Sequence, residues 1–238
     1  MVRVDRILIV ATSRELLGDT AVKTGVWAEE LAAPYYVFKS HGYMVDIASI
    51  RGGKVPIDPE SLQGQAGRST AVRRFYEDAH AHAQLHNTQS IALIDPESYD
   101  AVFFAGGHGI MWDGVANKEV TRLVEGAYRA GRVVAAVCHG PAALLDATDG
   151  QGRPLVAGKQ VTCLTNSEEE LSKRAALVPF LLQDALTEKG AKFVRAVADM
   201  SPFAVSAGRI ITGQNPASSR MVAELTVEAL SFGVRLTP

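Results

Sequence analysis

The fold of this chain is decided by the stretch Val133–Pro141, which reads VVAAVCHGP. Its first five residues are small or β-branched and apolar, which is typical of a strand buried on both faces. Pro141 suits the first turn of a helix, where its missing N–H costs little. The pattern therefore predicts a buried strand, a tight turn at Cys138 and a helix after the turn.

Cys138 is a candidate nucleophile because it falls on this turn, at the carboxyl end of the predicted strand. The positive end of the following helix and a nearby imidazolium would stabilise its thiolate, as in the strand-to-helix elbow of hydrolases. The alternative is core filling, since free cysteines are often buried. Cys163 lies mid-strand without a basic neighbour, and we expect it to pack in the core. Two cysteines do not make a disulfide framework and favour a reducing compartment.

Length, charge and hydropathy bound the class of protein. The chain has 238 residues, 47% of them hydrophobic, and no linker interrupts its pattern, so we expect one domain over residues 1–238. Its net charge is −2 and its Lys and Arg residues are scattered, which argues against nucleic-acid binding. We find no signal peptide and no apolar run of roughly 18 residues. These features predict a cytoplasmic protein that binds neither nucleic acid nor membrane.

Apolar runs of strand length alternate with helical patterns along the chain. Such alternation predicts a doubly wound, mostly parallel sheet with helices on both faces, whose ligands bind at the carboxyl ends of the strands. We also expect a hairpin that turns at residues 206–209. The predicted strands are Ile7–Ala11, Val45–Ile50, Ala101–Ala105, Val133–Val137 and Val161–Leu164, and the predicted helices cover residues 29–41, 117–130, 178–189 and 218–232.

Residues 52–95 depart from this pattern, because they are polar and contain several Gly and Pro residues around a helical stretch at 73–86. Long excursions of this kind are commonly lids or binding loops, and we expect this one to shape the pocket as a small cap. His80, His82 and His86 invite a metal-site interpretation. A solvated helix face is the competing interpretation, no cysteine cluster completes a site, and we therefore predict no metal.

The histidines restrict which group can serve the thiol. The chain has six, at positions 41, 80, 82, 86, 108 and 139, so none follows Cys138 by more than one residue. A papain-like order, with a distant later histidine, is therefore excluded. The partner is either His139 or a residue from an earlier strand end. At a sharp elbow the imidazole of His139 can swing beside the sulfur, although a helix-terminal histidine bonded to a carbonyl is the alternative.

The segment Ala105–Gly109, with the sequence AGGHG, ends the neighbouring predicted strand. Its glycines permit close backbone approach and positive φ values. Backbone N–H groups presented there, together with that of His139, are candidates for an oxyanion hole. His108 is the second candidate imidazole for the same reason.

An imidazole used in this way normally needs a carboxylate that orients its far nitrogen. Glu168, Glu169 and Glu170 follow the strand predicted at 161–164, and at most one of three consecutive helical residues points into a site. A second candidate group is Glu29–Glu30. A carboxyl buried near a thiol would have a raised pKa and would hold or shuttle a proton.

With these residues assembled, the chain resembles the DJ-1/PfpI superfamily and, within it, the Hsp31-like class. The resemblance covers nearly the whole length and implies a flavodoxin-like fold, usually dimeric. It makes Cys138 the nucleophile, His139 its partner, Glu30 a protonated carboxyl at the sulfur and Glu169 the third triad member, with Glu168 one residue away. The motifs that carry it are GVWAEE at 25–30 with Pro34, AS at 48–49 with GG at 52–53 and PID at 56–58, AGGHG at 105–109, VCHGP at 137–141, TNSEE at 165–169 and ITGQNPASS at 211–219.

The activity that the resemblance implies is a glutathione-independent glyoxalase, which converts methylglyoxal and water to lactate through a hemithioacetal on Cys138. The amides of Gly107 and His139 would receive the oxyanion, with His108 beside them. No nicotinamide, flavin or metal is needed for this internal redox reaction, and residues 106–109 lack the full spacing of a dinucleotide fingerprint. The alternatives are a holdase chaperone and a deglycase or small amidase that uses the same cysteine.

Overall fold

The computed structural model describes residues 5–231, which form a seven-stranded sheet with the strand order β3-β2-β1-β4-β5-β9-β8. All neighbouring strands are parallel except β8 and β9, which form an antiparallel pair. The doubly wound, mostly parallel sheet predicted from the sequence is confirmed. The strands of the sheet are β1 (Arg6–Ala11), β2 (Met44–Ser49), β3 (Gln89–Ser90), β4 (Ala101–Phe104), β5 (Val133–Val137), β8 (Ala204–Ala207) and β9 (Ile210–Gly213).

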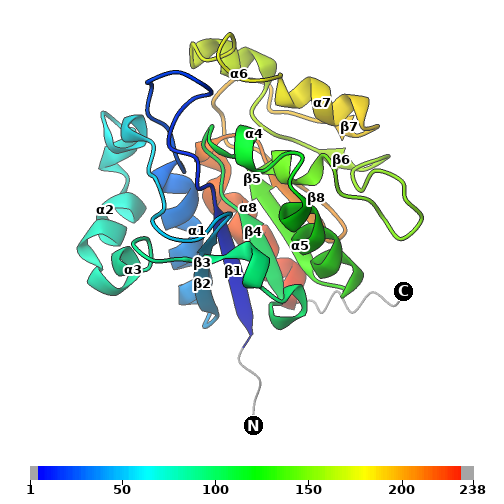
Figure 1. The fold of residues 1–238 in the computed structure, drawn as a ribbon, viewed down its shortest axis with the longest axis horizontal. Coiled ribbons are helices and arrows are strands. Elements are labelled where there is room, and N and C mark those ends of the chain that lie inside the picture. The colour runs from blue at the N-terminus through cyan, green and yellow to red at the C-terminus, as the bar shows by residue number, and fades with distance from the viewer. Residues whose placement is uncertain (1–4, 232–238) are drawn as a thin grey trace.

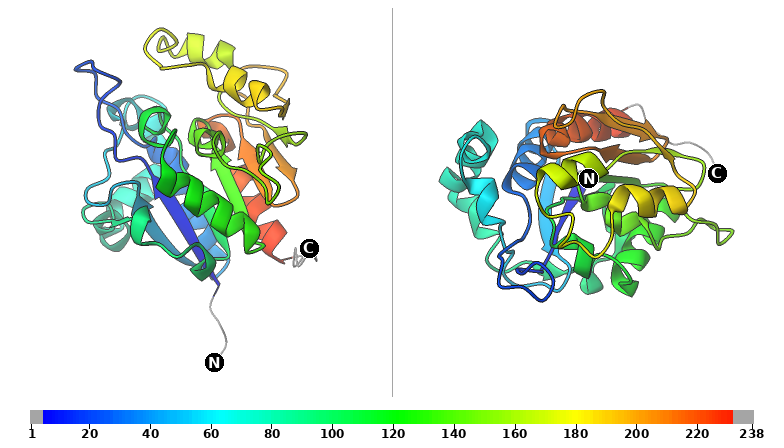
Figure 2. Two further views of the ribbon diagram at one scale, coloured as in Figure 1. Left: turned by 45° about the vertical axis from the view of Figure 1, so that its right-hand side comes forward. Right: turned by 90° about the horizontal axis from the view of Figure 1, so that it is seen from above.

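Helices cover both faces of this sheet (Figure 1). Helices α1 (Ala28–Ser40) and α8 (Ser219–Ser231) pack on one face, where Phe38 and Val222 join alternate strand residues such as Phe103 in one buried cluster. Helix α5 (Lys118–Arg129) packs on the other face, where Leu123 joins the intervening strand residues. Strand side chains alternate between the two faces, so two separate cores form on one sheet. Figure 2 shows the two layers from the side.

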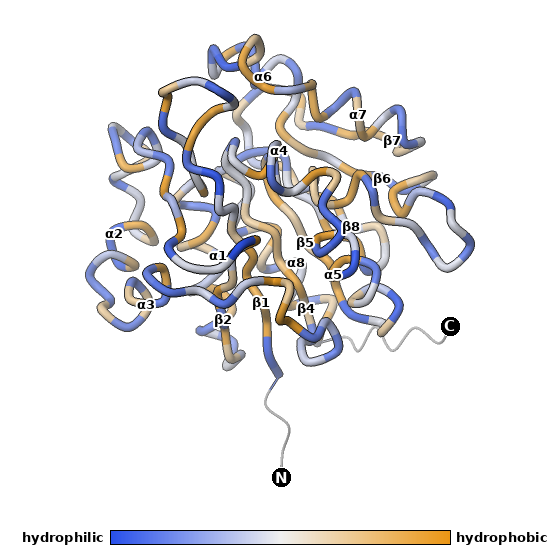
Figure 3. Tube along the Cα trace, in the orientation of Figure 1, coloured by the Kyte–Doolittle hydropathy of each residue, from blue (hydrophilic) through white to orange (hydrophobic). Residues whose placement is uncertain are grey.

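The hydropathy of the trace explains this arrangement (Figure 3). All five residues of β5 and all four of β4 are buried, because both faces of these central strands are covered by helices. Such strands are near-continuous apolar runs rather than alternating ones. Within residues 5–231, no helix has the length and apolar character needed to cross a bilayer.

The chain after Cys138 continues into the expected helix, which is a short 3₁₀ helix over Gly140–Leu144. Gly140 lies so close to the backbone of Phe104 that an added Cβ would come within 2.3 Å of the carbonyl oxygen. The turn is thus held tightly against the end of β4. The expected helix at 178–189 is also shorter, because α7 covers only Leu182–Glu188. Pro179 disfavours helical geometry at the residue before it, so the helix begins later.

The strand expected at 161–164 is not part of the main sheet. Only Gln160–Val161 form a strand, β6, which pairs in a separate two-stranded sheet with β7 (Lys192–Phe193). Beyond Val161, the backbone N–H groups of Thr162 and Leu164 donate to the Thr212 hydroxyl and the Cys138 carbonyl instead of to a ladder. This segment therefore crosses the carboxyl ends of the main strands. The predicted end of the last helix, residue 232, lies outside the described residues.

The excursion at 52–95 holds two short helices, α2 (Thr70–Glu77) and α3 (Ala79–Ala83), instead of one helical stretch. Asp78 separates them, because its side chain caps α3 by accepting a hydrogen bond from the N–H of Ala81. Helix α2 packs on α1, with the rings of Phe75 and Tyr35 edge to face at 5.4 Å. The excursion thus covers the outer side of α1. The remaining α-helices are α4 (Ile110–Asp113) and α6 (Asn166–Leu171).

Candidate active site

Cys138 lies where β5 ends and has a φ angle of +60°, which residues other than glycine rarely adopt. Its N–H donates to the carbonyl of Gly213 and its carbonyl accepts from Leu164, so three segments hold the residue in place. The thiol is 4% exposed. A strained backbone held by its surroundings costs about 1–3 kcal/mol and is typical of functional positions. Cys138 thus belongs to the buried cluster on the α1 and α8 side and at the same time lines a cavity.

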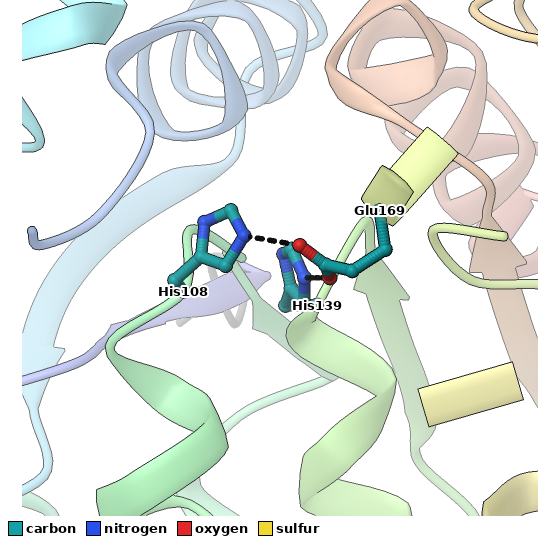
Figure 4. Close-up of side chains that lie close together, drawn as sticks. All are labelled: His108, His139 and Glu169. Atoms are coloured by element: carbon teal, nitrogen blue, oxygen red, sulfur yellow. Dashed lines mark hydrogen bonds and ion pairs between the residues drawn. The ribbon is translucent and has the colours of Figure 1, made fainter. Parts of the chain in front are cut away.

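A chain of hydrogen bonds runs from this thiol through His139 to Glu169. The sulfur lies 3.4 Å from Nδ1 of His139, and Nε2 of the same ring lies 2.6 Å from Oε2 of Glu169. Figure 4 shows that His108 approaches the second oxygen of this carboxylate, at 2.7 Å from Oε1. One carboxylate therefore bridges two imidazoles, whose ring centroids are 4.1 Å apart.

Burial raises the pKa of Glu169, but the hydrogen bonds from His108 and His139 outweigh it and hold this pKa well below its usual range. Glu169 is thus a carboxylate at neutral pH. A carboxylate on Nε2 of His139 fixes the ring proton there and leaves Nδ1 free to accept a proton from the thiol.

Glu168 lies beside Glu169 and serves a different purpose. Its Oε2 accepts the N–H of Thr165, and the Thr165 hydroxyl in turn accepts the N–H of Glu168, which completes a capping box at the start of α6. Its Oε1 accepts bonds from Gln214, Asn215 and the N–H of Met200. Of the two carboxylates between which the sequence left the choice open, Glu169 contacts the histidines and Glu168 ties together the segments around the cavity.

Glu30, on α1, is fully buried and accepts the N–H of Gly106 at 2.8 Å through Oε2. Burial raises its pKa well above the usual range, although the Cys138 thiol and Gly106 oppose this. Burial likewise raises the pKa of Cys138, and a charged Glu30 raises it further. A protonated Glu30 removes that charge and favours the thiolate. The neighbouring Glu29 points elsewhere and accepts a hydrogen bond from Ser69.

The loop after β4 provides backbone donors beside the thiol. The N–H groups of Gly107 and His139 donate to no acceptor within residues 5–231. Gly107 has φ +95°, and an added Cβ would lie 2.2 Å from the Gly25 carbonyl oxygen and 2.6 Å from the Trp27 nitrogen. Only glycine lets the chain pass here. Gly107 and His139 both line the cavity that Cys138 also lines.

This cavity has a volume of about 310 Å³. Its walls are largely apolar, and its lining includes His108, Cys138 and His139 together with charged side chains. The excursion at 52–95 contributes one lining residue, Glu60, whereas the segment from 164 to 200 contributes six. The cap role of the excursion stays a prediction. The lining residues are Trp27, Glu60, Gly107, His108, Cys138, His139, Leu164, Glu168, Leu171, Ser172, Arg174, Met200 and Pro216.

The sequence did not single out Arg174. Its guanidinium is 5% exposed and donates from Nη1 to Oδ2 of Asp58 at 2.8 Å and to Nδ1 of His108 at 3.0 Å. Its Nη2 lies 3.0 Å from Glu60. Nothing in the local sequence distinguishes Arg174 from the adjacent Lys173, since its partners lie far away along the chain. Cys163, as expected, is packed in the core, where its thiol donates to the Leu164 carbonyl.

Metal ligation was also considered from the sequence. The donor atoms of His108, His139 and Glu169 lie within 4.8 Å of one another, but they are hydrogen-bonded to each other and the Arg174 cation occupies the other nitrogen of His108. A cation next to the ligands disfavours a metal there. The rings of His82 and His86 pack edge to face at 5.1 Å, and no third ligand joins them within the described part of the chain.

The mostly parallel sheet, with a cysteine, a histidine and a carboxylate gathered at its strand ends, places the chain in the flavodoxin-like α/β class. The chain belongs to the DJ-1/PfpI family, whose profile matches residues 21–229. The resemblance inferred from the motifs is therefore confirmed.

Three members of the family are similar to this chain over nearly its whole length. The glutathione-independent glyoxalase HSP31 of Saccharomyces cerevisiae is 30% identical over 94% of this chain and 98% of its own. The crystal structure of glyoxalase III from Candida albicans has a TM-score of 0.82 at 28% identity, covering 94% of this chain and 97% of its own. The X-ray structure of Rapid Encystment Protein 24 KDa from Francisella tularensis has a TM-score of 0.90 at 36% identity, covering 95% and 99%.

Proposed function

We propose that this protein is a glutathione-independent glyoxalase that converts methylglyoxal and water to lactate through an adduct on Cys138. The observation that carries the proposal is the pairing of two carboxyl groups around one thiol. Glu169 is held as a carboxylate behind His139, whereas burial favours the protonated form of Glu30 beside the sulfur. Relatives that share nearly the whole chain carry the glyoxalase name. A proton acceptor and a proton donor on either side of a nucleophile suit this reaction.

The first step is addition of sulfur to the aldehyde carbon. His139 takes the thiol proton on Nδ1, the C–S bond forms, and the aldehyde oxygen becomes an oxyanion. The free N–H groups of Gly107 and His139 receive this oxyanion, which is then protonated to the hemithioacetal. His139 is stabilised as a cation in this step by Glu169.

The second step moves a proton between adjacent carbons. The proton on the sulfur-bearing carbon leaves to His139, or to Glu30 once that carboxyl has given its own proton to the oxyanion. An enediolate forms, and a proton returns to the neighbouring carbon. The former aldehyde carbon is oxidised to a thioester while the ketone is reduced to an alcohol, so no outside oxidant is consumed. Water then attacks the thioester, the C–S bond breaks, and lactate leaves while the sulfur recovers its proton.

The test is lactate formation from methylglyoxal by the purified protein without glutathione. We expect turnover by the wild-type chain and a loss of at least about 10³-fold in kcat/KM for Cys138→Ala, the range seen when nucleophiles are removed. Circular dichroism checks that the variant is folded. If the wild-type protein forms no lactate, the proposed function is wrong.

A second candidate activity is that of a holdase chaperone, and the observation that favours it is exposed apolar surface at the cavity rim. Leu171 is 61% exposed and Met200 is 51% exposed. Suppression of client aggregation by such a surface does not need the thiol, so Cys138→Ala would retain it while losing lactate formation. A deglycase or amidase activity would instead be lost in the same variant.

The assembly and compartment belong to the proposal as well. We expect a homodimer in the cytoplasm, as the resemblance to the Hsp31-like class implies. Light scattering on the purified chain measures its mass against the 25.4 kDa of one chain, and a monomer at all concentrations would contradict the dimer.

A further inference from the structure

Arg174 fixes the position of the proton on His108. A guanidinium only donates hydrogen bonds, so Nδ1 of His108, 3.0 Å from Nη1, must accept. The proton of a neutral ring then lies on Nε2, the nitrogen that faces Oε1 of Glu169 at 2.7 Å. The other hydrogen of Nη1 goes to Asp58, which is 0% exposed, so the arginine is itself held from behind.

We propose that Arg174 is a positioning residue that locks His108 as a neutral donor to Glu169, and thereby leaves His139 as the one base available to Cys138. The kinetic test of this inference rests on the proposed function, whereas the NMR test of the His108 tautomer does not. His108 and the Ser172 hydroxyl, at 2.7 Å and 2.9 Å, both donate to Oε1 of Glu169, and the other oxygen stays on His139. The carboxylate cannot turn away, and the thiol–imidazole–carboxylate chain stays aligned.

The charges around His108 support this division of labour between two stacked imidazoles. His108 faces His139 at the elbow, Glu169 on α6 and Arg174 after α6. Arg174 in turn contacts the carboxylates of Asp58 and Glu60. Burial and His139, with a smaller contribution from Arg174, lower the pKa of His108 to about 4. A proton taken from Cys138 therefore stays on His139 and is not shared with the neighbouring ring.

The direct test is the ¹⁵N NMR spectrum of the histidine rings in the wild-type protein. We expect His108 to be neutral with its proton on Nε2 from pH 5 to pH 8. A ring protonated on Nδ1, or a ring that titrates near its ordinary pKa, would overturn the inference, whatever the enzymatic activity of the chain. This arm needs no variant and therefore separates the inference from the proposed function.

The second test removes Arg174 without leaving a buried unpaired carboxylate. In the double variant Arg174→Met with Asp58→Asn, we expect kcat to fall at least about 10-fold with little change in KM, since alignment and not substrate binding is lost. We also expect the pKa of His108 to move upward from about 4 in the kcat profile, because the Arg174 cation that opposes its protonation is removed. Unchanged kcat, an unchanged pH profile and an unchanged His108 tautomer together would refute the role of Arg174.

Two controls separate positioning from general damage. Asp58→Asn alone keeps the bond from Arg174 to His108 and should keep the Nε2 tautomer in the NMR spectrum. Arg122→Gln removes a structural arginine far from the site, whose guanidinium donates to the carbonyls of Ile91 and Ile94, and should lower thermal stability without changing the pH profile. An equal change of pH profile in Arg122→Gln would show that the effect is not specific to Arg174.

Discussion

The active site joins two regions of different construction: the strand ends of the main sheet and the segment that crosses above them. Cys138 and the loop at 105–109 follow β5 and β4, whose residues are all buried. Glu169, Arg174 and Met200 come from the segment between β6 and β9, which includes the two-stranded sheet and α6 (Figure 1). The nucleophile is thus placed by local chain geometry, and its carboxylate by tertiary contacts between distant segments.

The largest expected effect comes from changing Glu169, the carboxylate that the crossing segment places behind His139. In Glu169→Gln we expect kcat/KM for lactate formation to fall about 10³-fold, because an amide no longer fixes the tautomer of His139 or stabilises its cation. Steady-state kinetics measures the loss, which corresponds to about 4 kcal/mol of transition-state stabilisation. A loss below 10-fold would remove Glu169 from the catalytic chain.

Glu168→Gln is the matched control from the adjacent position. Its carboxylate accepts bonds from Thr165, Gln214, Asn215 and Met200, and contacts neither histidine. The NH₂ group of a glutamine cannot accept these hydrogen bonds. We therefore expect the free energy of unfolding, measured in urea, to fall by about 1–3 kcal/mol, with a much smaller loss of kcat/KM than in Glu169→Gln. Equal kinetic losses in the two variants would contradict the separate roles of the two residues.

The elbow could be predicted because its causes are local. A run of five small apolar residues predicts the strand, the residues after it predict the turn, and both are set by nearest neighbours along the chain. The helix after Cys138 was predicted, but its 3₁₀ form and its tight approach to β4 were not: a Cβ added to Gly140 would lie 2.3 Å from the Phe104 carbonyl oxygen. That constraint comes from β4 and has no local signature.

The crossing segment was less predictable for the same reason. The pattern at 161–164 indicated one more strand of the main sheet, but the N–H of Thr162 bonds the side chain of Thr212 instead. Which of the three consecutive glutamates points at the histidines depends on where α6 begins. The capping box at Thr165 fixes that start. Arg174 acts on partners more than 60 residues away along the chain, at His108 and Asp58.

A second prediction concerns Glu30 on α1, which accepts the N–H of Gly106 just after β4. In Glu30→Gln we expect kcat to fall about 10²-fold, within the range for removal of a general acid or base, because the protonated carboxyl beside the sulfur can no longer shuttle a proton. The loss should appear in kcat as a function of pH, with a larger isotope effect for substrate deuterated on the aldehyde carbon.

Glu29→Gln is the control for this substitution, since Glu29 occupies the next position of α1 but accepts its hydrogen bond from Ser69 on the outer side. We expect its kcat to match that of the wild type. If Glu30→Gln also keeps wild-type turnover at every pH, Glu30 takes no part in proton transfer.

The smallest expected effect concerns the backbone that brings the two oxyanion donors together. In Gly107→Ala the new Cβ would meet the Gly25 carbonyl oxygen at 2.2 Å and the Trp27 nitrogen at 2.6 Å, both of them backbone atoms that cannot move aside alone. Gly42→Ala is matched in φ, at +85°, but has nothing within 4 Å of the new atom. We expect Gly42→Ala to cost about 1 kcal/mol through φ strain, and Gly107→Ala about 2 kcal/mol more in urea unfolding. Equal losses of unfolding free energy in the two variants would mean that the loop after β4 adjusts easily to the new Cβ. The rigidity of this loop would then not explain the position of the Gly107 amide.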